Sequence, residues 1–172
     1  MKVGDSVRTG EFSRATLRLP AGSVLRIDEF TTLRVQESLT SGKRATAVVS
    51  AGGVFLYSRS SPEEIDFATP VATGAIKGTE VLIRVEPSGA SSITVLEGAV
   101  ELTPTNGPAG AVAASFGSGE KAEIKTDGSV TRTAVLDAVA PVQWALYYPA
   151  VLDPAVAEPA AGSPWRDAWS AY

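Results

Sequence analysis

The chain has 172 residues, of which 44% are hydrophobic and 20% charged, a composition typical of a folded globular protein. It contains no His and no Cys, which excludes Ser-His-Asp and Cys-His catalysis, zinc sites with nitrogen or sulfur ligands, iron–sulfur clusters and disulfides. The formal charge is −4, and no run of one sign is long enough to indicate a nucleic-acid partner. No apolar run approaches the ~20 residues that a membrane span requires.

Three Leu-Arg-aliphatic triplets stand near the start of the chain, at 17–19, 25–27 and 33–35. Because successive side chains of a strand point to opposite faces, the aliphatic members are expected on an inner face and Arg18, Arg26 and Arg34 on the outer one. The pattern predicts three short strands whose arginines are solvated surface. A ladder of the same three arginines as a contact for an anion is the alternative reading.

Alternation and turn residues continue to about residue 135. A short apolar run at 54–57 follows Gly52-Gly53, residues 81–85 alternate, and Asp127-Gly128 has the chemistry of a two-residue hairpin turn. The sequence therefore predicts an all-β domain of about a dozen short strands. We expect two facing sheets, solenoid-like or sandwich-like, with a short C-terminal helical appendage.

The motifs that could carry chemistry are weak. The glycine-containing stretches 74–79 and 117–121 lack the spacing of a phosphate loop and each precedes a strand, so they are read as structural turns. The carboxylates of 63–66 are read as a solvated loop rather than an acid/base pair or a cation site. We therefore expect no catalytic residues, no bound metal and no cofactor, and hence a protein that is not an enzyme.

The composition changes after Val135, which divides the chain into a β domain at 1–136, a linker rich in aromatic residues, Pro and Ala at 137–163, and the start of a helix at 164–172. The helix has Ser163 as its N-cap and Pro164 at its first position. Its aromatic spacing is also that of the first helix of a tetratricopeptide repeat. The aromatic side chains of this end are candidates for contact with a partner, with packing on the β domain as a lid as the alternative. They are Trp144, Tyr147, Tyr148, Trp165, Trp169 and Tyr172.

Ordered blocks from Val3 to about Val135 resemble the FecR domain, a periplasmic β domain named for a regulator of iron-citrate uptake. The opening block contains Val3-Gly4-Asp5 and Ser13-Arg14-Ala15, the middle block Lys77-Gly78-Thr79-Glu80-Val81, and the last Gly119-Glu120. The resemblance implies a non-enzymatic periplasmic or otherwise extracytoplasmic module. Such a module relays a signal by contact with a protein partner or with a neighbouring domain of the full-length protein.

Members of that family that control sigma factors join a helical N-terminal domain and a membrane helix to this domain. This chain contains neither, so the resemblance alone does not predict sigma control. A homodimer through the C-terminal aromatic residues is a further expectation. The alternative function is a binding module for an anionic or glycan component of the cell envelope, with Arg18, Arg26 and Arg34 as its contacts.

Overall fold

A computed structural model describes residues 4–18, 23–37, 45–57, 65–107, 113–137 and 140–146. Strands make up 64% of this part of the chain. The predictions made for Leu19, the last residue of the first triplet, for Tyr147 and Tyr148, and for the helix at 164–172 lie outside it. In chain order the elements are β1 (Ser6–Arg8), β2 (Ala15–Arg18), β3 (Val24–Ile27), β4 (Thr32–Glu37), β5 (Ala45–Tyr57), β6 (Ile65–Ala68), β7 (Ala72–Val85), β8 (Ser91–Pro104), β9 (Ala114–Gly117), β10 (Glu120–Ile124), β11 (Val130–Ala134), a 3-10 helix (Ala140–Val142) and α1 (Gln143–Leu146).

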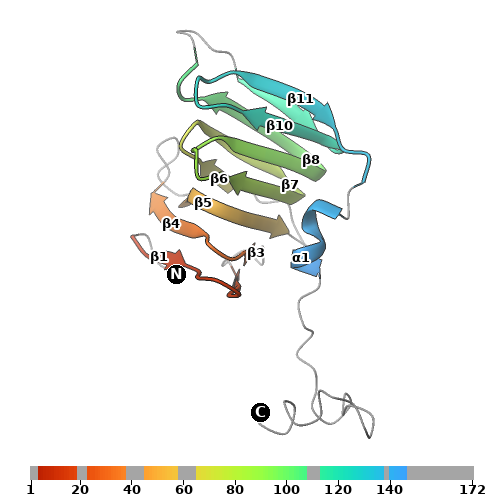
Figure 1. The fold of residues 1–172 in the computed structure, drawn as a ribbon. Coiled ribbons are helices and arrows are strands. Elements are labelled where there is room, and N and C mark those ends of the chain that lie inside the picture. Colours follow the sequence, from red (N-terminus) through yellow and green to blue (C-terminus); the bar gives the residue numbers. More distant parts are fainter. Residues whose placement is uncertain are drawn as a thin grey trace, which may run out of the picture.

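The strands form one continuous hydrogen-bonded sheet in the order β1-β4-β5-β6-β7-β8-β10-β11, with β3 on β5, β2 on β3 and β9 on β8 (Figure 1). The long strand β5 pairs with β4 through its first half and with β3 and β7 through its second half. The short strand β6 lies parallel to the start of β5 and antiparallel to the start of β7. These pairings close part of the sheet into a five-stranded mixed barrel.

The all-β prediction is confirmed, but the two facing sheets of short strands are wrong. Gly52-Gly53 and the stretch 74–79 were expected to separate short strands, and they lie inside the single strands β5 and β7. Gly98, which would also divide β8 if strands were short, lies inside that strand. Gly52 and Gly98 have positive φ angles of 82° and 102°. Because glycine accepts such angles without steric cost, it allows a long strand to bend as readily as it allows a strand to end.

The main hydrophobic core lies on one face of the bent sheet. The triplets behave as period 2 predicts: Leu25, Ile27 and Leu33 are buried in this core, whereas Arg18 and Arg34 are exposed. The remaining large side chains come from every long strand, so the core spans the whole described β domain. They include Val54, Leu56, Phe67, Ile76, Val81, Ile83, Ile93, Val95, Val100, Leu102, Phe116 and Ile124.

A second, smaller apolar cluster lies on the opposite face, which we call the outer face. Phe55 of β5 and Leu82 of β7 are directly paired there and are each only 2% exposed, because Val142 and Ala145 cover them. We call residues 140–146 the C-terminal segment. Figure 1 shows it beside the end of β5, where β5 is paired with β7. A segment that comes after the last strand therefore covers part of the outer face of the sheet, over the paired residues Phe55 and Leu82.

Candidate interaction site

Two turns meet at one end of the sheet, residues 9–14 between β1 and β2 and residues 28–31 between β3 and β4. We call them the twin turns. The Thr9 hydroxyl donates to the carbonyl of Asp28 at 2.6 Å and accepts from the Thr31 amide at 2.9 Å. The Thr9 amide in turn donates to the carbonyl of Thr31 at 2.9 Å. Both threonines are buried, so these bonds are shielded from water and hold the two turns together.

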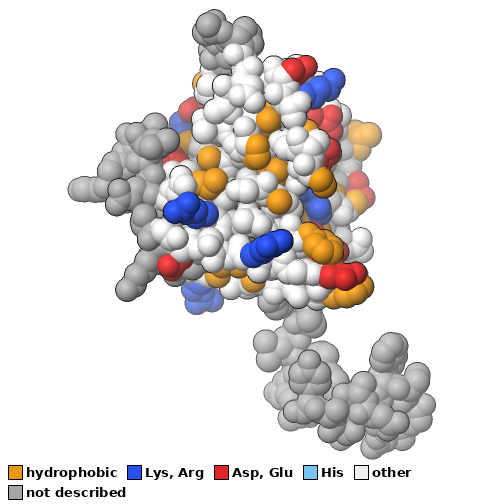
Figure 2. All heavy atoms as spheres, turned by 60° about the vertical axis from the view of Figure 1, so that its left-hand side comes forward, with side chains coloured by type: hydrophobic (Ala, Val, Ile, Leu, Met, Phe, Trp, Pro, Cys, Tyr) orange, Lys and Arg blue, Asp and Glu red, His pale blue; other side chains and the backbone are white. Residues whose placement is uncertain are grey.

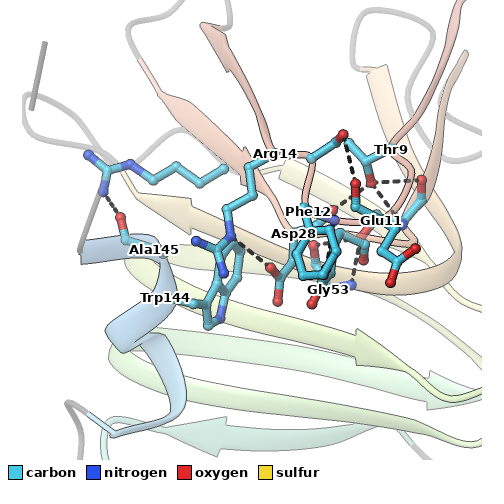
Figure 3. A network of polar contacts seen from close by, with 12 residues as sticks. Thr9, Glu11, Phe12, Arg14, Asp28, Gly53, Trp144 and Ala145 are labelled. Atoms are coloured by element: carbon cyan, nitrogen blue, oxygen red, sulfur yellow. Dashed lines mark hydrogen bonds and ion pairs between the residues drawn. The ribbon is translucent and has the colours of Figure 1, made fainter. Parts of the chain in front are cut away.

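The twin turns pack against the bend of β5 at Gly52 and Gly53. The Gly53 amide donates to the Thr31 hydroxyl at 2.9 Å, and the Asp28 amide donates to the Gly53 carbonyl at 2.9 Å (Figure 3). A Cβ on the neighbouring Gly52 would lie 2.3 Å from the Thr31 hydroxyl and 2.5 Å from its Cα. Glycine is therefore required at 52 both for its φ and for this close approach.

The rim of the twin turns carries two exposed aromatic side chains in an unusual backbone conformation. Phe12 and Phe30 have φ angles of 54° and 52° and are 91% and 59% exposed. The Phe12 amide donates to the Glu29 carboxylate at 3.0 Å, and the Phe30 amide to the Gly10 carbonyl at 3.4 Å. A left-handed conformation costs a residue of this type about 1 kcal/mol or more, which the cross-links between the turns offset.

The carboxylate of Asp28 joins the twin turns to the outer face. Its Oδ1 accepts from Nε of Arg14 at 3.0 Å, and its Oδ2 lies 3.5 Å from a terminal nitrogen of Arg84 on β7. The Asp28 side chain is largely buried, while both arginine side chains are more than two-fifths exposed. One carboxylate thus orients two guanidinium groups, and the triad keeps a net charge of +1.

Those two guanidinium groups both contact the ring of Trp144 in the C-terminal segment. The Cζ atom of Arg14 lies 5.7 Å from the centroid of that ring (Figure 3), and the Cζ atom of Arg84 lies at the same distance. The indole Nε1 donates to the Pro141 carbonyl at 3.1 Å, which fixes the orientation of the ring. A cation within about 6 Å of an aromatic face is attracted by it, so Asp28, Arg14 and Arg84 together form a holder for Trp144.

Arg26 makes the second connection to the C-terminal segment. Its guanidinium donates to the carbonyl of Ala145 and lies 5.5 Å from the ring of Tyr57. Arg26 is half-buried, so its reading as solvated surface is wrong. The face was predicted correctly from period 2, but the segment that covers that face comes more than a hundred residues later and leaves no local trace.

The structure does not place the three arginines in one ladder. Arg26 is paired with Thr16 on β2 and Phe55 on β5, Arg18 is paired with Val24, and Arg34 is paired with Ser6 and Val48 on another part of the sheet. Strands β3 and β4 are not hydrogen-bonded neighbours. On the face in Figure 2 the basic side chains are scattered singly among polar and hydrophobic ones. Anion binding by this set stays a prediction.

The carboxyl groups with a shifted pKa lie away from this site, around the β10–β11 hairpin. The pKa of Glu120 is lowered by the backbone amide of Gly117 and by Arg132, that of Glu123 by Lys121, and that of Asp127 by Ser129. These contacts stabilise the charged form and so lower the pKa, which is the opposite of what a general acid needs at neutral pH. Within the described ranges, no three acidic, His or Cys side chains are grouped as metal ligands would be.

Sequence reasoning found part of this site. Of the six aromatic residues proposed as contacts, Trp144 is in the described part of the chain, and there it packs half-buried on the outer face of its own β domain. Asp28, Arg14 and Arg84 were missed as a group. Arg14 belongs to the opening block and Asp28 precedes a turn, but nothing in the local pattern brings either close to residue 84.

The sequence of this chain matches a known protein family. The family model "FecR protein" matches residues 5–101, more than half of the chain. The chain, with its all-β domain, therefore belongs to the FecR protein family. No curated protein matches the chain.

Two crystal structures of a candidate anti-sigma factor from Parabacteroides distasonis match with a TM-score of 0.66 and 17% sequence identity. Each match covers 82% of this chain and 64% of the solved chain, so this chain spans less than two thirds of that protein's length. At this identity the likeness concerns the fold. None of the helices in the described ranges is long and apolar enough to cross a membrane.

Proposed function

We propose that this chain is a non-enzymatic, extracytoplasmic signal-relay module of the FecR type, which acts by contact with a protein partner or with a neighbouring domain. Membership of the FecR family supports this class of function. The observation that carries the mechanism is the contact of Trp144 with both Arg14 and Arg84. Through it, the position of the C-terminal segment depends on the twin turns.

The proposed relay depends on Asp28, which contacts both the twin turns and the outer face. Asp28 belongs to the twin turns through its backbone carbonyl, which accepts from Thr9, and to the outer face through its carboxylate. A displacement of the turns would therefore move Arg14 directly and would release Arg84 from one of its partners. Both changes weaken the contact with Trp144, so a partner bound at the twin turns could alter the position of the C-terminal segment.

The proposed extracytoplasmic location of the protein can be tested with an introduced thiol, because the chain has no Cys of its own. Leu136→Cys places a thiol at a residue that is 98% exposed, and Ala122→Cys places one at a residue that is fully buried. In the full-length protein in intact cells, a membrane-impermeant maleimide should label position 136, and should label position 122 only after denaturation. Labelling of position 136 only after lysis of the inner membrane would contradict the extracytoplasmic location.

The relay is tested by the transcript profile of the native bacterium. Trp144→Ala should reproduce much of the profile of a strain from which the gene is deleted, while Val130→Ala, at an exposed position of β11, should not. A normal profile in the Trp144→Ala strain, with the variant protein present at normal abundance, would show that the C-terminal segment does not relay the signal.

A further inference from the structure

The dipeptide Glu-Phe occurs twice in the twin turns, as Glu11-Phe12 and as Glu29-Phe30. In both copies the Phe is left-handed and its ring is exposed to solvent. Positions with positive φ are usually occupied by Gly, Asn or Asp. Phe relieves no backbone strain at either position and fills no core there, so neither local structure nor packing accounts for its presence.

The two rings stand on a rigid support. Each Phe amide is bonded to the other turn, Phe12 to the Glu29 carboxylate and Phe30 to the Gly10 carbonyl, and beneath them the two turns share the buried bonds of Thr9 and Thr31. An aromatic side chain on a fixed backbone loses little conformational entropy when a partner covers it. Exposed aromatic residues on a preorganised support are typical anchors of protein interfaces.

We propose that the twin turns are the contact site for a partner protein whose surface offers an apolar pocket edged by Lys or Arg. This deepens the proposed function by naming the input surface, and it rests on that function. Asp28 is bonded to Arg14 and Arg84, whereas the two other carboxylates of the twin turns, Glu11 and Glu29, each directly precede one of the two Phe residues. Glu11 is exposed beside Phe12, and aromatic faces also attract cations. The same acidic residues disfavour an anionic lipid surface.

Site-specific photo-crosslinking in the full-length protein, in living cells of its own species, tests this contact. The photoreactive analogue p-benzoylphenylalanine replaces Phe12, Phe30 or, as a control, Leu136, which is also exposed and apolar. Each variant is first checked for an unchanged thermal midpoint, which the exposure of these rings leads us to expect. We expect one protein adduct of the same mass from positions 12 and 30 and none of that mass from position 136.

Charge variants test the stated chemistry. Glu11→Arg should lower the adduct yield by about tenfold or more, because it sets like charges against each other, whereas Glu97→Arg, at an exposed position of β8, should change it less than about twofold. Mass spectrometry of the adduct should locate the crosslink in a partner peptide with Lys or Arg beside apolar residues.

The following outcomes would contradict the proposed contact site. The proposal fails if positions 12 and 30 give no adduct, if they give the same products as position 136, or if they crosslink to lipid or to a second copy of this chain. It also fails if the crosslinked peptide is acidic or if Glu11→Arg has no effect. Maleimide labelling tests the location separately, so a failure there with a specific adduct here would reject the compartment and keep the contact site.

Discussion

Arg84 of β7 lies with its guanidinium 5.7 Å from the ring centroid of Trp144, a residue beyond the last strand of the domain. Arg14 lies at the same distance, and Asp28 bonds to both arginines. The apolar contact of Val142 and Ala145 with Phe55 and Leu82 accompanies this polar one. The outer face of the sheet is therefore covered in part by a segment that lies beyond the residues matched by the family model, 5–101.

Trp144→Ala should lower the free energy of unfolding by roughly 1 to 3 kcal/mol, because it removes a half-buried ring together with two cation–π contacts. The midpoint of urea denaturation measures the change. Val130→Ala is the matched control, since Val130 is on exposed β11, and it should stay within about 0.5 kcal/mol. Equal effects of the two substitutions would mean that Trp144 is not held by the domain.

Gly52→Ala should destabilise the domain by roughly 2 kcal/mol or more. The new Cβ would be forced against Thr31 at a backbone position with a φ of 82°. Gly10→Ala is the control, because a Cβ at position 10 meets no atom within 4 Å and Gly10 is not among the glycines with positive φ. Its effect on the denaturation midpoint should be small. If both variants unfold alike, the bend of β5 does not rest on Thr31.

Gly52 also shows what could and could not be predicted from the sequence. Period 2 identified the inward residues of the triplets. Asp127-Gly128 does lie in the hairpin connection between β10 and β11, but the connection is longer than a two-residue turn: the Lys125 amide donates to the Ser129 carbonyl, and of Asp127 and Gly128 only Gly128, at 81°, has a positive φ. A glycine that bends a strand has the same local signature as one that ends it, so β5, β7 and β8 were each divided into shorter pieces.

The site was harder to predict, because its contacts are between residues distant in the sequence. The alternation of polar and apolar residues predicts which face of a sheet a residue lies on, but it does not predict which strands are neighbours. The pairing of β3 with β5 rather than with β4 was therefore not predicted. No sequence pattern pointed to Phe12 and Phe30, because the features that distinguish them, a positive φ and an exposed ring, are visible only in the structure.

Thr31→Val should cost about 1 to 3 kcal/mol of stability, because valine has a similar shape but leaves the buried Gly53 amide without its acceptor. The measurement is again the urea midpoint. Thr131→Val, on the exposed strand β11, is the control and should be within about 0.5 kcal/mol of the original protein. A cost at Thr31 no larger than that at Thr131 would show that the hydroxyl bonds between the turns contribute nothing to stability.

Arg26→Ala should destabilise by about 1 to 2 kcal/mol, since it removes a charge-assisted bond to the Ala145 carbonyl and the contact with Tyr57. Arg34→Ala tests the same residue type in the next triplet at an exposed position, and its effect should be within about 0.5 kcal/mol. The comparison separates a structural arginine from a solvated one. Similar small effects would restore the reading of Arg26 as surface.

The central claim, that the twin turns and the C-terminal segment are energetically coupled through Asp28, is tested most directly by a double-mutant cycle of Asp28→Asn with Trp144→Ala. Asp28→Asn weakens the hold on Arg14 and Arg84, so part of its cost is the loosened contact with Trp144. The urea midpoints of the four proteins should give a coupling free energy of roughly 0.5 to 2 kcal/mol, with Asp28→Asn costing less when Trp144 is already absent. Additive costs, within about 0.3 kcal/mol, would contradict the account.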